Sequence, residues 1–304
     1  MQGLKGFSAG AKRRMLTSSK DIQRATPRIS MHSNKYSRGS VLIIAGSGRY
    51  SGAMKLAASA AAEALAALRT ESGYVTIAGP KRIVSSAARI SPVFVIRELS
   101  GPIKKQLSII KSIRHDAVIL GPGLEPANIK LELLKGIIKM EKSSGNCLVV
   151  DGAAIRALAN HRELINNCMV LTPHDGEFKA LAGINLKGAA LKTRISAAKK
   201  FAAEYNCILA LKGHKTVITD GKRLKVNVPK SPALATMGTG DVLAGMIASY
   251  LALHKDAFEG AVAAVHAHSM IGDKLYKKKG EHITAQDVAE AIPEVLKQFD
   301  ITRK

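Results

Sequence analysis

Residues 235–245 of this 304-residue chain read ATMGTGDVLAG and place small residues and one carboxylate directly before an apolar helix pattern. Glycine allows close backbone approach to a ligand and positive φ angles. The first turn of a helix offers unpaired N–H groups and the positive end of its dipole, which favours an anion. Asp241 is then either a first-turn charge of the helix or a base beside a bound phosphate. The stretch alone leaves both interpretations open.

Strand patterns and helix patterns alternate along the chain from residue 41 onward, and these elements must position the loop. Continuous apolar runs bounded by turn residues predict buried strands, and the segments between most of them have helical patterns. The fold class is therefore α/β, with a mostly parallel central sheet covered by helices on both faces. We expect one domain over residues 39–304 after a basic lead-in of residues 1–38. The predicted strands are 41–45, 74–78, 92–96, 117–120, 147–151, 168–172 and 207–213, followed by a hairpin over 216–228 and helices over 241–253, 257–277 and 284–298.

Turn details add to this prediction. Asp220-Gly221 is the preferred two-residue turn of a hairpin, and Thr284 is a candidate N-cap of the last helix. Polar and glycine-bearing loops follow nearly every predicted strand, and in an open parallel sheet ligands bind beyond the carboxyl ends of the strands. These loops should line one crevice: GSGRYSGA (46–53), GPGL (121–124), DGAA (151–154), TPHDGE (172–177), KGHKT (212–216) and MGTGD (237–241).

The composition limits the classes of protein to which the chain can belong. A net charge of +23 attracts polyanions, which makes a nucleic-acid-binding protein one alternative. The chain has no Trp and only 4% aromatic residues, and its basic residues are spread along it, so we expect no specific nucleic-acid function. No apolar run approaches the ~18–20 residues of a membrane span. The three cysteines each begin an apolar run, which favours buried thiols in a reducing, cytoplasmic compartment.

The lead-in holds nine Lys and Arg residues against the single acid Asp21. Such a basic, acid-poor segment is typical of a transit peptide, although it lacks a secretory apolar core. A segment that docks on the domain is the competing interpretation.

Taken together, AGSGRYSGA, GPGL, LTPHDGE, LKGHKT and ATMGTGDVLAG resemble the ADP- or ATP-dependent NAD(P)H-hydrate dehydratases of the ribokinase-like superfamily. The resemblance extends over about residues 16–298 and includes PRISMHSNKYSRGS, which reduces the weight of the transit-peptide interpretation. The sequence departs from the family at Met237, where a glycine is usual, and at Asp175, where a proline is usual. It also departs at KSPAL, which precedes the MGTGD loop of residues 237–241, the expected anion loop. Asp175 puts the metal and substrate details of its loop in doubt.

The resemblance implies repair of a hydrated nicotinamide ring: ADP or ATP phosphorylates the hydroxyl, and phosphate then leaves to restore NAD(P)H. Such a transfer requires positioning and charge stabilisation more than covalent chemistry by the protein. By resemblance, Asp241 is the catalytic base, and the amides of Gly238, Thr239 and Gly240 form the anion hole for the phosphoryl group. Residues 235–245 would thereby hold a phosphate and activate the hydroxyl of the hydrate that accepts it.

The remaining site residues are carried over by resemblance. The substrate contacts would be Ala53, Gly123, His174 and Asp241, and the nucleotide contacts Lys212, Gly213, His214, Lys215, Thr216 and Gly240. Glu177 would organise Mg²⁺ through water. On the residues alone, His174 could instead cap a helix, Glu177 could be a first-turn acid and KGHKT an ordinary turn, while the role of Asp151 stays open.

The closest alternative is a ribokinase-like small-molecule kinase that acts on a vitamin precursor or sugar and releases a stable phosphoester. The choice between ADP and ATP, and between NADH and NADPH hydrate, is also open. The resemblance implies a homo-oligomer, commonly a tetramer, that works together with an NAD(P)H-hydrate epimerase on another chain.

Overall fold

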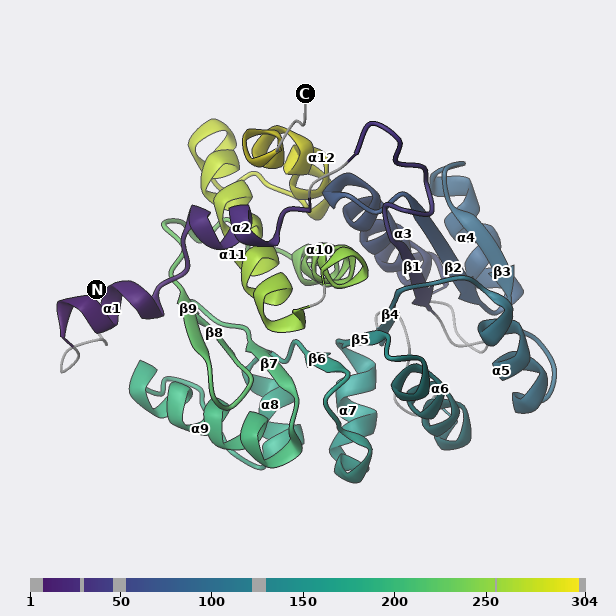
Figure 1. The fold of residues 1–304 in the computed structure, drawn as a ribbon, viewed down its shortest axis with the longest axis horizontal. Coiled ribbons are helices and arrows are strands. Elements are labelled where there is room, and N and C mark those ends of the chain that lie inside the picture. Colours follow the sequence, from purple (N-terminus) through teal and green to yellow (C-terminus); the bar gives the residue numbers. More distant parts are fainter. Residues whose placement is uncertain (1–7, 28–29, 46–52, 122–129, 255, 301–304) are drawn as a thin grey trace.

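A nine-stranded sheet in the order β3-β2-β1-β4-β5-β6-β7-β8-β9 forms the centre of the molecule (Figure 1). The computed structural model describes residues 8–27, 30–45, 53–121, 130–254 and 256–300, with the backbone alone for residues 9, 11–12 and 53–61. Every pairing from β3 to β7 is parallel, and β8 and β9 are added antiparallel. The strands are β1 (Ser40–Ile44), β2 (Tyr74–Gly79), β3 (Val95–Glu98), β4 (Ala117–Leu120), β5 (Cys147–Val150), β6 (Met169–Leu171), β7 (Ile208–Leu211), β8 (Thr216–Thr219) and β9 (Leu224–Asn227).

Helices cover both faces of the sheet, so nearly all residues of the central strands are buried, as their continuous apolar runs predict (Figure 1). One apolar core lies between the sheet and α2 (Ser19–Ala25), α3 (Ala53–Thr70), α4 (Lys81–Ile90), α10 (Thr239–Leu253), α11 (Ala257–Lys279) and α12 (Ala285–Leu296). The second core lies beneath α5 (Ile103–Ser112), α6 (Leu131–Ser144), α7 (Ala153–Ala159), α8 (Asp175–Ala182) and α9 (Leu191–Tyr205). Two short 3₁₀ turns, η2 (Arg162–Leu164) and η3 (Lys297–Phe299), complete the described elements. The predicted α/β architecture is confirmed.

The strand order reverses at β1, because β1 lies between β2 and β4. Such a switch point opens a crevice at the carboxyl ends of the strands, where α/β proteins bind ligands. Gly121, which directly follows β4, shows how tightly the backbone is packed there: a Cβ atom on it would lie 1.8 Å from the Asp151 carbonyl oxygen. This position accepts only glycine.

The lead-in carries two short helices, α1 (Ala9–Met15) and α2. In Figure 1, α1 extends away from the body of the molecule, whereas α2 lies against α11. Ile22 and Ala25 of α2 are fully buried in the first core. Between the two helices, Leu16 forms an isolated parallel bridge with Val226 of β9. This part of the lead-in is thus packed on the domain.

Two local predictions are wrong. The third strand begins at Val95 rather than at residue 92, because residues 92–93 form a turn. The β8–β9 hairpin has a four-residue loop, 220–223, instead of a two-residue turn, since Thr219 pairs with Leu224. Asp220 accepts hydrogen bonds from the N–H groups of Lys222 and Arg223 at 2.9 and 2.6 Å, and this side-chain cap stabilises the longer loop.

The last helix begins as predicted. Thr284 is the N-cap of α12: its side chain accepts from the Asp287 N–H at 3.3 Å, and the Asp287 carboxylate accepts from the Thr284 N–H at 2.8 Å. Across the described ranges, no helix combines the length and the apolar character needed to cross a membrane.

Candidate functional site

The anion loop forms the start of α10, at the carboxyl edge of the sheet. Gly238 is the N-cap and has a φ of 90°, a left-handed conformation that glycine adopts without strain. Thr239 is buried, and its hydroxyl lies 2.8 Å from the carbonyl oxygens of both Leu234 and Thr236. The Thr239 N–H also donates to Thr236, at 3.3 Å. The loop is therefore shaped by its own hydrogen bonds, with Asp241 in the first turn of the helix.

Met237 is the family departure inside this loop. Its side chain is 78% exposed. Because the side chain lies in solvent, it leaves the backbone of residues 238–240 undisturbed. The structure therefore accommodates the departure.

Lys212 directly follows β7 and reaches the anion loop. Its ammonium lies 2.6 Å from Oδ1 of Asp151, and a Cβ atom placed on Gly240 would lie 3.5 Å from the same nitrogen. Burial opposes the charge on Lys212, but the carboxylates of Asp151, Glu177 and Asp241 outweigh it and raise its pKa. A permanent cation thus lies beside the loop expected to hold phosphate.

Asp151, whose role the sequence left open, has a defined place. It directly follows β5 and is buried; its carboxylate accepts a hydrogen bond of 2.7 Å from the hydroxyl of Thr172 and forms the ion pair with Lys212. The only sequence signal for this contact was a lone carboxylate at a strand end. Its partners Thr172 and Lys212 lie 21 and 61 residues away along the chain, so no local pattern indicated them.

Two further carboxyl groups lie in the same region. Burial raises the pKa of Glu177, with Lys212 opposing the shift and Asp151 adding to it. Glu63 on α3 is fully buried, and no described residue forms a hydrogen bond with either of its carboxyl oxygens. Burial, together with Asp241 and Asp151, raises the pKa of Glu63 far above its usual range. The environment of Glu63 thus favours its protonated form beside the expected base, and sequence reasoning missed this residue.

His174 performs the capping role that was its alternative interpretation. Its Nδ1 accepts from the N–H groups of Gly176 and Glu177 at 3.0 and 3.3 Å, and Glu177 accepts from the His174 N–H at 3.1 Å. This reciprocal capping box begins α8. Because Nδ1 is the acceptor, Nε2 carries the proton, and the side chain is 55% exposed. Nε2 lies 3.5 Å from Oε1 of Glu177, so His174 is a cap whose two ring nitrogens both lie near Glu177.

Asp175, the departure at this loop, is neutralised. It forms an ion pair with Arg194 of α9, a buried residue whose Nη2 also donates to the Lys212 carbonyl at 2.9 Å. The Lys212 N–H in turn donates to the Pro173 carbonyl at 2.8 Å. Asp175 therefore braces the backbone that carries Lys212, through an arginine that no motif indicated.

A cavity of about 700 Å³ opens beside the anion loop. It contains five of the six expected nucleotide contacts, and Lys215 is the one that does not line it. His174 also lines the cavity, and so do the buried side chains of Asn227 and His268, which the motifs did not indicate. Burial lowers the pKa of His268 to about 4, so this imidazole is neutral. The lining residues are His174, Lys212, Gly213, His214, Thr216, Asn227, Pro229, Ser231, Pro232, Leu234, Ala235, Thr236, Thr239, Gly240, Leu243, Val265, His268 and Ser269.

The expected hydrate contacts are described only in part. Gly123 lies outside the described residues, as do the loop residues 46–52 and 122–129. Ala53 is the first residue of α3, described by its backbone alone. The two loops begin after β1 and β4, the strands that flank the switch point.

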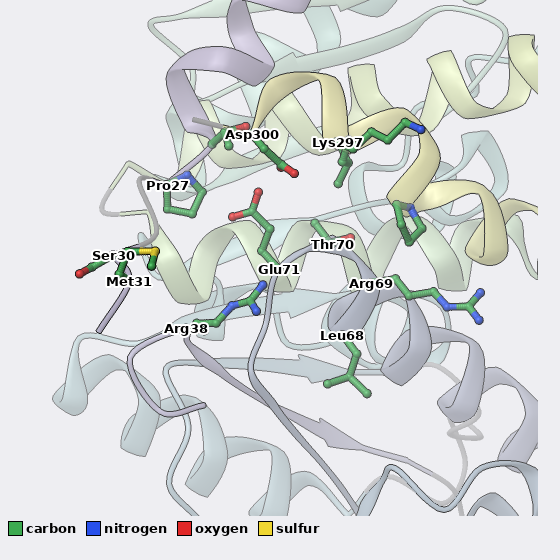
Figure 2. A pocket seen from close by; sticks show the side chains of 13 residues that line it. Pro27, Ser30, Met31, Arg38, Leu68, Arg69, Thr70, Glu71, Lys297 and Asp300 are labelled. Atoms are coloured by element: carbon green, nitrogen blue, oxygen red, sulfur yellow. The ribbon is translucent and has the colours of Figure 1, made fainter. Parts of the chain in front are cut away.

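A second cavity, of about 450 Å³, lies elsewhere (Figure 2). Its charged residues lie before β1, at the end of α3 and at η3, so it opens near the amino ends of the strands rather than at the anion loop. Figure 2 shows the carboxyl group of Glu71 pointing toward Asp300, with the guanidinium of Arg38 on the other side. Burial and Asp300 raise the pKa of Glu71 to about 8, and Arg38 opposes this shift. The residues expected to do the chemistry are absent from its lining.

A metal cage is not preformed in the described part of the chain, because no three His, Cys, Asp or Glu side chains there converge on one point. Glu177 and Asp151 are engaged by the His174 N–H and by Lys212. This arrangement fits a Mg²⁺ ion held mainly by nucleotide phosphates and water, with Glu177 as an outer contact, since Mg²⁺ retains its hydration.

The mostly parallel sheet, with a glycine loop at the start of α10, a carboxylate in its first turn and an adjacent lysine, has the ribokinase-like fold. Residues 41–294 match the family model described as NAD(P)H-hydrate dehydratase, and the chain belongs to that family.

Named relatives agree with this membership. An ADP-dependent (S)-NAD(P)H-hydrate dehydratase from Cenarchaeum symbiosum is 33% identical over 291 residues, which is 92% of this chain and 96% of the relative. A bifunctional NAD(P)H-hydrate repair enzyme from Pyrobaculum aerophilum is 35% identical over 88% of this chain, and the chain spans only 52% of its length. The ADP/ATP-dependent NAD(P)H-hydrate dehydratase from Bacillus subtilis, co-crystallized with ATP/Mg²⁺, has the same fold, with a TM-score of 0.74, 22% identity, and coverage of 93% of this chain and 98% of that one.

Proposed function

We propose that this chain is an ADP-dependent (S)-NAD(P)H-hydrate dehydratase that converts ADP and the hydrate into AMP, phosphate and NAD(P)H. The observation that carries the proposal is the position of Lys212. This one ammonium is paired with Asp151 and lies beside Gly240 of the anion loop, at the wall of a cavity large enough for a nucleotide. The Cenarchaeum symbiosum relative, 96% of whose length this chain covers, is named for the same reaction and supports the proposal.

In the proposed reaction Asp241 removes the proton from the hydroxyl of the hydrate as the terminal phosphoryl group of ADP is transferred to that oxygen. The amides of Gly238, Thr239 and Gly240 and the ammonium of Lys212 stabilise the charge on the moving group. The ring nitrogen of the hydrate then expels phosphate, the neighbouring ring carbon loses a proton, and the ring double bond returns. A Mg²⁺ ion bound with the nucleotide would supply further charge neutralisation.

The contacts of the two substrates are also a proposal. We propose that the nucleotide is bound by Lys212, Gly213, His214, Lys215, Thr216 and Gly240, five of which line the cavity. Nε2–H of His174 is a suitable donor to the hydrate, because capping fixes the tautomer. Ala53 and Gly123 remain proposed contacts on the hydrate side.

The cellular setting is also a proposal. We propose a cytoplasmic homo-oligomer, a tetramer by family resemblance. Because a relative about twice as long is a bifunctional repair enzyme, the epimerase that would supply the correct hydrate belongs either to a separate chain or to a fused one.

One assay tests the function against the kinase alternative. Purified protein is incubated with NADH hydrate or NADPH hydrate, Mg²⁺ and either ADP or ATP, while the absorbance of reduced nicotinamide is followed. We expect AMP, phosphate and NAD(P)H in equal amounts with ADP, and no phosphorylated small molecule by mass spectrometry of a single turnover. A stable phosphoester of a thiazole, pyrimidine or sugar alcohol, with the hydrate unchanged, would establish the kinase instead.

A further inference from the structure

The lead-in reaches the wall of the nucleotide cavity, although it lies before residue 41, where the family match begins. Leu16 bridges Val226, and the Thr17 N–H donates to the Val226 carbonyl at 3.1 Å. Lys225 reinforces this contact, since its ammonium lies 3.3 Å from the Leu16 carbonyl and 3.0 Å from Asp21. The segment is thus fixed against β9, the strand that ends at Asn227.

Thr17 places a hydroxyl between the buried side chain of Asn227 and the half-buried side chain of His266. Its Oγ1 lies 2.9 Å from Oδ1 of Asn227 and 2.9 Å from Nδ1 of His266, and the two partners are themselves 3.3 Å apart. Burial lowers the pKa of His266, with the nearby cations Lys225 and Lys230 acting in the same direction and Asp21 and Asp273 opposing. A neutral imidazole with its proton on Nδ1 satisfies all three contacts, since Nδ1–H donates to both oxygens and Thr17 donates to Asn227.

This arrangement fixes the orientation of the Asn227 amide. Asn227 is only 4% exposed, and it lines the same cavity as Lys212 and Gly240. Its Oδ1 faces Thr17 and His266, and none of the described residues hydrogen-bonds its Nδ2. The Nδ2 group is therefore the end of the amide left to donate to a ligand.

We propose that Asn227 donates from Nδ2 to an acceptor atom of the adenine nucleotide, and that Thr17 of the lead-in is the positioning residue that orients it. The inference rests on the proposed use of this cavity for the nucleotide. It makes the lead-in part of the nucleotide site, although Thr17 and Asn227 are 210 residues apart along the chain. The hydrate side of the site is not involved.

The test measures ADP binding by calorimetry together with kcat and both KM values. Thr17→Val removes the hydroxyl at nearly constant shape, and we expect ADP affinity to fall by about fivefold to tenfold, in line with one lost hydrogen bond. The KM for the hydrate and kcat should stay within about twofold, and Thr17→Ser should bind ADP normally. Thr26→Val is the matched control, because the Thr26 hydroxyl donates to the Ile22 carbonyl within the lead-in and does not contact Asn227 or His266 in any described hydrogen bond.

A second pair of variants keeps the test decisive if Thr17→Val folds poorly. Asn227→Asp retains the acceptor for Thr17 but replaces Nδ2 with an oxygen, and it should weaken ADP binding more than Thr17→Val. In the Asn227→Ala background, Thr17→Val should have no further effect on ADP affinity, which a general loss of packing would not produce.

The outcomes separate the inference from the function. Normal ADP affinity in both Thr17→Val and Asn227→Asp, in a protein that repairs the hydrate, would overturn the inference alone. If the effects of Thr17→Val and Asn227→Ala on the free energy of ADP binding were additive, the positioning role of Thr17 would be overturned. A wild-type protein that binds no ADP would overturn the proposed function and the inference with it.

Discussion

The Lys212 ammonium and the Asp151 carboxylate, 2.6 Å apart, join the carboxyl ends of β7 and β5 across the intervening strand β6. Thr172, which follows β6, completes the bridge with its hydrogen bond to Asp151. Three consecutive strand ends therefore fix one cation beside the anion loop. This rigidity favours charge stabilisation without reorganisation during the reaction.

Asp241→Asn tests the base. The amide keeps the size and polarity of the carboxylate but cannot accept the hydroxyl proton, so we expect turnover to be abolished while nucleotide affinity changes by no more than a few-fold. Steady-state kinetics and ADP calorimetry measure the two quantities. A near-normal kcat would show that Asp241 only stabilises the start of the helix.

Asp151→Asn tests the anchoring of Lys212. Loss of one partner leaves the other charge buried and free to turn toward the remaining carboxylates. We expect kcat to fall by about tenfold or more, with a raised KM for the nucleotide. Asp116→Asn is the control, because Asp116 accepts from the Ser40 N–H near the amino end of β1. Equal effects of the two substitutions would assign a purely structural role to Asp151.

Gly240→Val tests the space around the anion loop. A Cβ at this position meets Lys212 at an ordinary contact distance of 3.5 Å, so alanine should fit, whereas the two further methyl groups of valine crowd the ammonium and the phosphate. We expect the valine variant to slow the formation of AMP, phosphate and NAD(P)H together by about 10²-fold, and the alanine variant to be much milder. Quantification of the three products checks this. Unequal slowing would separate phosphoryl transfer from elimination.

Glu71→Gln tests the second cavity through the pH dependence of stability. The folded pKa of about 8 lies above the ordinary value of 4.5, so this group contributes stability fully below pH 4.5, and the contribution is lost as the pH rises toward 8. Relative to wild type, the glutamine variant should therefore gain on the order of 1–3 kcal/mol between pH 5 and pH 8.5. Urea unfolding at both pH values measures the difference, with the exposed acid Glu132→Gln as control. A pH-independent difference would contradict the shifted pKa.

Nucleic-acid binding provides a test of the other class of function. Any affinity for duplex DNA should be indifferent to sequence and should fall steeply with salt, because it would depend on phosphate neutralisation alone. A footprint at one preferred sequence at physiological salt would support the binding-protein alternative.

The sequence by itself determined the elements and the order in which they follow one another. Continuous apolar runs are buried strands because both faces of the sheet are covered, and the Gly238–Gly240 loop begins a helix because its residues favour that local conformation. Thr284 caps its helix for the same local reason. The hairpin turn was wrong because Thr219 and Asp220 offer the backbone hydrogen bonds that compete with a two-residue turn.

Only the tertiary structure decided which distant side chains meet. Asp151 with Lys212, Asp175 with Arg194, and Thr17 with Asn227 are joined by contacts between elements that are separate in sequence. Such pairs leave no periodic signal, because each partner satisfies its local pattern equally well without the other. Their geometry arises when the sheet brings the strand ends to one edge, and burial then makes each unpaired charge or donor costly.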